Sequence, residues 1–194
     1  MKTSIRLVLI VLAGAIVAAA TFAVYMLSGL NDEEEPLNKL GGIENFIPAR
    51  EVKMAPPVQF LGEDGEKLNL EHFRGRVVVL NLWATWCAPC VEEMPTLDHL
   101  QQQLAPLGVV VVALSLDRGG PQAVREFFDE NEIENLEVFV DPTMRAQDGF
   151  NVIGLPTTIL IDREGRERGR IVGPAAWDDA KAADLVLSAS APLK

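Results

Sequence analysis

The chain has 194 residues, of which 48% are hydrophobic and 23% are charged, so it can form one ordinary domain with an appendage and is too apolar to be disordered. Its 17 basic and 28 acidic residues give a formal charge of −11, which argues against a nucleic-acid partner, because phosphate binding needs clustered Lys and Arg. Two cysteines cannot form a disulfide framework or a four-thiolate zinc site, and with only two histidines we expect no metal centre.

The first feature along the chain is an uncharged apolar run over residues 7–30, with two basic residues before it and an acidic cluster after it. As a helix the run spans about 36 Å, enough to cross a hydrocarbon core of roughly 30 Å. We expect residues 1–30 to be a retained membrane anchor, because the run is longer than the apolar part of a cleaved signal peptide. Small residues at positions 18–20 leave a cleaved signal as the alternative. Either segment exports the rest of the chain.

Residues 31–57 combine acidic residues, two adjacent glycines and four prolines with weak hydrophobic periodicity. This composition is typical of a flexible linker. The sequence therefore predicts a linker over residues 31–57 and one folded domain over residues 58–190.

Within residues 58–190, apolar runs alternate with turn signals and with segments of helical periodicity. The expected strands are 58–61, 67–70, 76–83, 108–116, 137–140, 157–162 and 167–172, and the expected helices are 88–104, 122–131, 142–150 and 175–188. Helices between buried strands imply parallel crossovers, and the closing hairpin adds antiparallel pairs. The expected class is α/β, with a central mixed β-sheet flanked by helices.

A pair of cysteines follows the strand 76–83, in the segment Trp-Cys87-Ala-Pro-Cys90. Cys87 falls at the expected start of a helix, where free backbone N–H groups and the helix dipole stabilise a thiolate. Cys90 lies three residues later on the same helical face. We expect one exposed, acidic thiol and one shielded thiol, as thiol–disulfide exchange through a mixed disulfide requires.

Two other interpretations of the pair are open. A purely structural bridge would close a loop of four residues, worth about 1.9 kcal/mol by the chain-entropy formula, against about 3 kcal/mol for fifteen residues. A metal site would need two more ligands, and neither His72 nor His99 is near in sequence. Redox exchange is the interpretation that we favour.

The residues around the cysteines resemble the thioredoxin superfamily, and in particular its membrane-anchored TlpA/ResA-like thiol–disulfide reductases. The resemblance covers about residues 56–187 and rests on four pieces of sequence. They are Phe-Arg-Gly-Arg-Val at 73–77, Leu-Asn-Leu-Trp-Ala-Thr-Trp-Cys at 80–87, Glu-Met-Pro at 93–95 and Gly-Leu-Pro-Thr-Thr at 154–158. It implies a thioredoxin-like fold and a redox-active disulfide in place of a cofactor.

The resemblance also implies roles for residues beyond the two cysteines. The Leu155–Pro156 bond is expected to be cis, to pack against the sulfurs and to leave the Leu155 backbone free to pair with an extended substrate. Glu93 corresponds to a buried acid that handles the proton of the shielded thiol, the alternative being a solvent-facing helix carboxylate. Trp86 is expected to shield the substrate. Thioredoxin itself carries a buried aspartate where this chain has Asn81, which cannot accept a proton at neutral pH, so the role of base moves to Glu93 or to water.

The same resemblance implies the partners and the location. The expected clients are proteins with cysteines or disulfides, namely apocytochrome c or copper-site cysteines of oxidase assembly, with a membrane thiol reductase as electron donor. The expected location is the bacterial inner membrane, with a single N-terminal span and the catalytic domain in the periplasm. A thiol peroxidase and a copper carrier on the same fold are the alternatives. The chain lacks the Thr or Ser and the Arg that a thiol peroxidase needs around its reactive cysteine. It also lacks the wider cysteine spacing and the distant histidine of a copper carrier.

Overall fold

The computed structural model describes residue 43 and residues 45–190. The strands are β1 (Phe46–Pro48), β2 (Gln59–Leu61), β3 (Lys67–Asn69), β4 (Val77–Trp83), β5 (Val109–Ser115), β6 (Phe139–Val140), β7 (Thr157–Ile161) and β8 (Glu167–Val172). The α-helices are α2 (Ala88–Leu104), α3 (Pro121–Glu130), α4 (Arg145–Gly149) and α5 (Ala180–Ser188), and two 3-10 helices cover Leu70–Phe73 and Ala105–Leu107.

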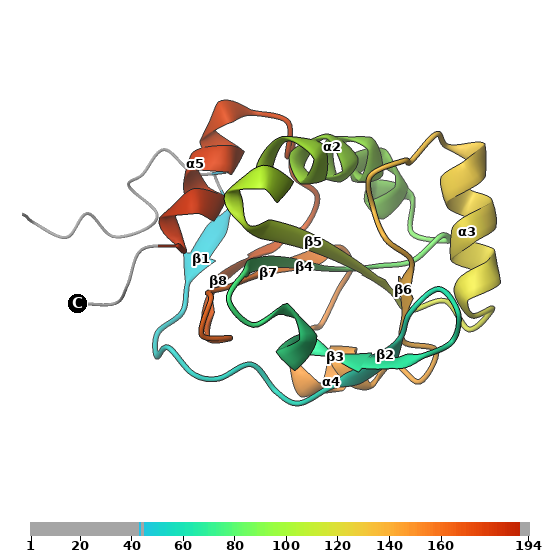
Figure 1. Ribbon diagram of the computed structural model, residues 1–194, viewed down its shortest axis with the longest axis horizontal. Helices are drawn as coiled ribbons and strands as arrows, with labels where there is room; N and C mark the ends of the chain where they lie inside the picture. The colour runs from blue at the N-terminus through green and yellow to red at the C-terminus, as the bar shows by residue number, and fades with distance from the viewer. Residues whose placement is uncertain (1–42, 44, 191–194) are drawn as a thin grey trace, which may run out of the picture. The chain divides into compact units, whose positions relative to one another are not determined.

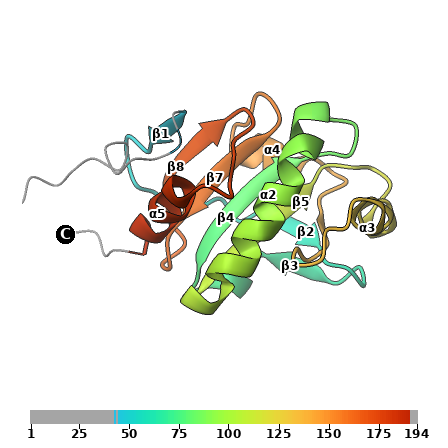
Figure 2. The same cartoon turned by 90° about the horizontal axis from the view of Figure 1, so that it is seen from above.

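The strands form one mixed sheet in the order β1-β8-β7-β4-β5-β6-β2-β3. The pairs β4–β5 and β5–β6 are parallel, whereas the remaining pairs are antiparallel. The crossover from β4 to β5 runs through α2, which lies along the sheet in Figures 1 and 2. The expected α/β class with a mixed sheet flanked by helices is thus confirmed.

Both faces of the sheet are covered by apolar side chains. One cluster joins α2, α3 and α5 to the face of β4 that carries Val77, Val79 and Trp83, and it includes both cysteines. The other joins the segment around α4 and the β2–β3 hairpin to the opposite face, through Val78 and Leu80. Every residue of β4 and of β5 is buried, as expected for strands covered on both sides.

The expected linker over residues 31–57 differs from the structure at its C-terminal end. Residues 46–48 form β1, which pairs antiparallel with β8, and Met54 forms a bridge with Arg166. Phe46 is buried in the cluster beneath α5. The folded unit therefore begins before residue 58, because a buried aromatic side chain and the open edge of β8 hold this short segment on the sheet.

The last helix begins later than the expected residue 175. Asp179 caps α5, its side chain accepting a hydrogen bond from the Lys181 N–H. Residues 174–177 form a loop in which the Ala175 N–H donates to Glu93 and the Trp177 N–H donates to Thr96, both on α2. No helix in the described part of the chain is long and apolar enough to cross a membrane. The expected anchor, residues 1–30, lies outside that part.

Candidate active site

The two cysteines lie where β4 turns into α2 and are joined by a disulfide with a Cα–Cα distance of 5.2 Å. Cys87 is the N-cap of the helix, and its carbonyl oxygen accepts the N–H groups of Cys90 and Val91. Pro89 falls in the first turn, where a missing N–H leaves no intrahelical bond unmade. Cys87 is 7% exposed and Cys90 is 0% exposed. Both residues are buried in this disulfide form, so the expectation of one exposed thiol in the reduced protein stays a prediction.

Glu93 lies one helical turn after Cys90 and is 3% exposed, so the alternative of a solvent-facing carboxylate is wrong. Its Oε1 accepts from Asn81 Nδ2 at 2.8 Å. Its Oε2 accepts from the Ala175 N–H at 2.9 Å and from Trp177 Nε1 at 3.3 Å. Burial raises the pKa of Glu93 to about 6, against the opposing effect of these hydrogen bonds. A carboxyl of this kind can exchange a proton close to neutral pH.

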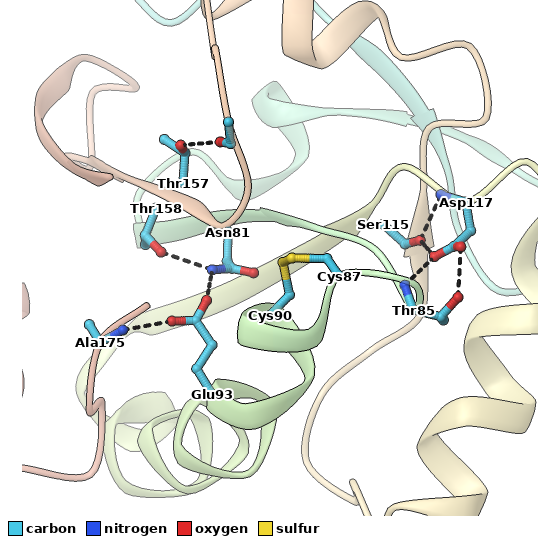
Figure 3. The surroundings of a disulfide bond; sticks show 11 residues. Asn81, Thr85, Cys87, Cys90, Glu93, Ser115, Asp117, Thr157, Thr158 and Ala175 are labelled. Carbon is cyan, nitrogen blue, oxygen red and sulfur yellow. Dashed lines mark hydrogen bonds between the residues drawn. A yellow bond between two sulfur atoms is a disulfide. The ribbon is translucent and has the colours of Figure 1, made fainter. Parts of the chain in front are cut away.

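Asn81 lies on β4 beside this carboxyl and is completely buried. Its Nδ2 also donates to Thr158 Oγ1 at 2.9 Å, so one amide nitrogen ties α2 to β7. Its Oδ1 is buried without a hydrogen-bond partner among the residues described. Figure 3 shows this oxygen on the side of the amide that faces the disulfide.

A hollow of about 270 Å³ lies against Glu93 on the surface between α2 and the β8–α5 loop. Besides Glu93 it is lined by Glu92, Thr96 and residues 174–176. The hollow therefore borders Glu93, most of whose surface is enclosed by the protein.

The Leu155–Pro156 peptide bond is cis, as the resemblance implied. Leu155 is half-buried and packs against both apolar clusters, one of which contains the two cysteines. The Pro156 carbonyl accepts the Gly173 N–H at 2.9 Å, and strand pairing with β8 begins at Thr157. No hydrogen bond found within the described ranges uses the backbone of Leu155.

Exposed apolar side chains flank these elements. Trp86, immediately before Cys87, is 68% exposed, and Ile153, two residues before Leu155, is 95% exposed. The sequence analysis singled out Trp86 but missed Ile153. The sequence could have indicated Ile153, because it is an apolar residue in a loop, directly before the Gly-Leu-Pro segment and outside any expected strand or helix.

A second polar cluster anchors the loop that carries Cys87, and sequence reasoning missed it. Asp117 follows the C-terminal end of β5 and accepts from the Thr85 N–H at 2.9 Å and the Thr85 hydroxyl at 2.8 Å. The Ser115 hydroxyl donates to the same carboxylate at 2.6 Å. Figure 3 shows this cluster beside the disulfide, across from Glu93. The sequence could have indicated this cluster, because Ser115 and Asp117 are polar residues at the C-terminal end of a buried parallel strand.

The residues described include no group of three or more His, Cys, Asp and Glu side chains placed to hold a metal ion. His72 belongs to the cap of the 3-10 helix 70–73, where its Nδ1 lies within 3.3 Å of the Asn69 N–H. Besides the two sulfurs, the site contains the buried carboxyl groups of Glu93 and Asp117.

A mixed sheet, a Cys-x-x-Cys disulfide at a helix start and a cis proline packed against the same core define a thioredoxin-like thiol–disulfide oxidoreductase. Residues 50–187 match the Redoxin family, and the chain belongs to it. The redox-active group of this enzyme class is the disulfide itself.

Named relatives agree with this class. The thiol-disulfide oxidoreductase ResA of Bacillus thuringiensis subsp. konkukian is 35% identical over 121 residues, which is 62% of this chain and 69% of that protein. The thioredoxin-like protein YneN of Bacillus subtilis is 35% identical over 120 residues, covering 61% and 69%. A crystal structure from Chlorobium tepidum, described as a thiol:disulfide interchange protein DsbE, has a TM-score of 0.64 and 30% identity, and the match covers 72% of this chain and 96% of that one.

Proposed function

We propose that the chain is an exported, membrane-anchored reductase of disulfides in client proteins. The observation that carries this proposal is the unequal pair of sulfurs, with Cys90 fully buried one turn from a buried carboxyl and Cys87 at the helix start. This arrangement supports attack on the client by Cys87 and release of the client by Cys90.

The reaction begins with both cysteines reduced. The Cys87 thiolate attacks one sulfur of the client disulfide, forming a mixed disulfide and releasing the other client sulfur as a thiolate. Cys90 gives its proton to Glu93 and attacks the Cys87 sulfur. The Cys87–Cys90 bond forms, and the client leaves as two thiolates, which take one proton from Glu93 and one from water. A dithiol donor must then return two electrons, and we assign this step to a membrane thiol reductase.

The client is held beside the cysteines by contacts with little sequence selectivity. The free backbone of Leu155 pairs with an extended segment that carries the target cysteine, while Trp86 and Ile153 cover it. Such a site suits unfolded or extended chains. The cysteines of apocytochrome c and of copper sites in oxidase assembly are clients of this kind, and we propose them as substrates.

Two variants test the chemistry. Cys87→Ser is expected to abolish reduction of insulin disulfides, whereas Cys90→Ser is expected to accumulate a mixed disulfide on Cys87 that can be isolated with its client. Full activity of Cys87→Ser, or trapping through Cys90 in place of Cys87, would reject the assigned order of attack. Rapid oxidation of Cys87 by peroxide, or tight stoichiometric copper binding by the reduced protein, would favour the two alternative functions instead.

The proposed location rests on the apolar run over residues 7–30 and the basic residues before it. The full chain is expected to stay in the membrane pellet after alkaline carbonate washing, with its C-terminus accessible to protease from the periplasmic side. A chain that begins at residue 43 is expected in the periplasmic fluid when it is exported by an unrelated cleaved signal. Release of the full chain by carbonate would contradict the retained anchor.

A further inference from the structure

The buried amide of Asn81 has one satisfied end and one unsatisfied end. Nδ2 donates to Glu93 Oε1 at 2.8 Å and to Thr158 Oγ1 at 2.9 Å, while Oδ1 has no donor among the residues described. A buried carbonyl oxygen without a donor costs free energy in the folded state. Because this oxygen lies beside a redox-active bond, we look for a second state of the protein in which Asn81 Oδ1 receives a hydrogen bond.

The orientation of the amide follows from its partners. Turning the amide over would place Oδ1 against Glu93 Oε1. While the carboxylate is ionised, Oε1 can accept a hydrogen bond but cannot donate one, so the two oxygens would repel each other. The Thr158 hydroxyl can either donate or accept, so it does not decide the orientation. With Glu93 ionised, the amide must therefore direct its nitrogen to Glu93 and its oxygen away from it.

Figure 3 shows that the free oxygen points toward the sulfurs of the disulfide. Asn81 and Cys90 are both neighbours of Glu93, the first through a hydrogen bond and the second along one turn of α2. Reduction of the disulfide creates a new donor at this place, the S–H group of Cys90, which is fully buried.

We propose that Asn81 is a positioning residue whose amide accepts a hydrogen bond from the Cys90 thiol in the reduced protein and turns over to donate one to the Cys90 thiolate once Glu93 holds the proton. This inference rests on the proposed function, because it requires the Cys87–Cys90 bond to open during turnover. It assigns Asn81 a part in the release of the client, whereas the first attack by Cys87 needs no contribution from it.

The donors around Glu93 allow this turn. Oε2 accepts from the Ala175 N–H and the Trp177 indole, neither of which can become an acceptor. Oε1 faces the amide of Asn81, which exchanges donor for acceptor by rotating about its last torsion, a soft one in asparagine. The proton therefore belongs on Oε1. The Thr158 hydroxyl, which accepted from Nδ2 before the turn, then donates to Oδ1 in its place.

The proton balance of the step is simple. The S–H bond of Cys90 breaks and an O–H bond forms at Glu93 Oε1, which leaves a thiolate and a neutral acid. The acid donates to Asn81 Oδ1, and Asn81 Nδ2 donates to the thiolate. The thiolate attacks the sulfur of Cys87, and the client sulfur departs with the electron pair of the mixed disulfide. Each polar atom of the amide has a partner both before and after the transfer.

The S–H stretching band in the infrared spectrum tests the first contact. The chain has two cysteines, so in Cys87→Ser the single remaining S–H group is that of Cys90. Adding Asn81→Leu, which is close in size and has no polar atom, is expected to move the band to higher frequency because a hydrogen bond is lost. The matched control, Thr158→Val, removes a partner of Nδ2 and leaves Oδ1 in place, so the band should not move. An unmoved band in the Asn81→Leu protein overturns the inference.

The rate of client release tests the second contact. In a chain that retains both cysteines, Asn81→Leu is expected to slow resolution of a preformed mixed disulfide by about 10- to 100-fold, the loss of one hydrogen bond to a charged group. The rate at which Cys87 first attacks the client disulfide should stay within about twofold, a separation that general damage to the fold would not produce. Equal slowing of both steps contradicts the positioning role.

A third measurement needs no variant. On reduction, the side-chain carbonyl carbon of Asn81 is expected to shift in the NMR spectrum of the unmodified chain. The control is Asn135, whose Nδ2 donates to the Asp98 carboxylate. The chemical shift of its side-chain carbonyl carbon should not change. An unshifted Asn81 carbon overturns the inference even if Asn81→Leu does not fold. Failure of the reduced chain to open insulin disulfides would instead reject the proposed function, so the two failures are distinguishable.

Discussion

Glu93 is a buried acid that binds its proton more tightly in the folded chain than in the unfolded chain, since burial raises its pKa from 4.5 to about 6. Its Oε1 and Oε2 both accept hydrogen bonds, which favour the ionised form without outweighing the loss of water. The group therefore destabilises the fold when it is charged. That cost is the reason to expect it to act as a proton acceptor during turnover.

The first prediction concerns the pH dependence of stability. Between pH 4.5 and pH 6 the folded chain keeps the Glu93 proton and the unfolded chain releases it, so stability falls as the pH rises. The free energy of unfolding should drop by about 2 kcal/mol from this group alone. Glu93→Gln removes the titration. The difference between the two proteins, measured by urea unfolding of the oxidised form, should decline across this window, and a flat difference would contradict the raised pKa.

The second prediction isolates one hydrogen bond to Glu93. Trp177→Phe keeps the ring packing of a 2% exposed side chain but removes the indole donor at 3.3 Å. Because that donor favours the ionised carboxylate, the pKa of Glu93 should rise above about 6. NMR titration of the carboxyl carbon measures this. Trp86→Phe, which changes an exposed ring, is the control and should leave the titration in place.

Among the elements, the loop between β4 and α2 is the one that must hold Cys87, and Asp117 fastens it. Asp117→Ala should lower the free energy of unfolding by about 1–3 kcal/mol, because three buried or half-buried donors lose their acceptor. It should also slow insulin reduction by about tenfold or more, since Cys87 would no longer be held in place.

The control for this third prediction is Asp98→Ala. Asp98 accepts two backbone N–H groups, those of Asn135 and Leu136, and holds the loop before β6. Its removal should destabilise the fold by a similar amount and leave the rate of insulin reduction within about twofold. If both variants slow the reaction equally, the loss in the Asp117 protein reflects stability and not placement of Cys87.

The fourth prediction tests whether β1 is part of the fold in solution. A Cβ at Gly169, on β8, would overlap Phe46 Cζ and lie 2.6 Å from the Ile47 carbonyl oxygen. Gly169→Ala should therefore destabilise the protein by about 1–3 kcal/mol, as overpacking usually does. Gly154→Ala, where a Cβ meets nothing within 4 Å, is the control for urea unfolding. Equal stability of the two variants would mean that β1 is not seated there.

Elements with strong local signals could be predicted from sequence, and those held by distant partners could not. The helix over residues 88–104 follows from a cysteine and proline start and from steady periodicity, and α2 has those limits. β1 has three residues and a composition typical of a linker, and it forms because β8 offers an open edge. Residues 175–179 favour a helix locally, but hydrogen bonds from the Ala175 and Trp177 N–H groups to Glu93 and Thr96 hold this segment against α2 as a loop.

The same limit applies to the site. The positions of Cys87, Cys90 and Glu93 followed from fixed spacings along one segment, and that of Pro156 followed from a second motif over residues 154–158. The cluster around Asp117 joins the ends of two parallel strands that only the sheet brings together. Contacts of this kind depend on register and cannot be predicted from local spacing.

At the scale of the whole molecule, the charge of −11 should influence which clients reach the site. The fifth prediction is that a basic peptide with a disulfide reacts faster at low ionic strength than at high, whereas an acidic peptide shows the reverse. Stopped-flow rates between about 20 and 500 mM salt measure this, with a neutral peptide as the control. Identical salt dependence for all three peptides would show that charge does not guide the encounter.

The two outermost strands of the described sheet, β1 and β3, have three residues each. A strand this short presents few unpaired backbone groups, which makes it a poor template for another chain to extend the sheet. The clients that we propose are extended, unfolded chains, and such chains are the ones most prone to add a strand to an exposed sheet edge. Short edge strands therefore allow the protein to bind such clients at the cysteines without pairing with them along the edges of the sheet.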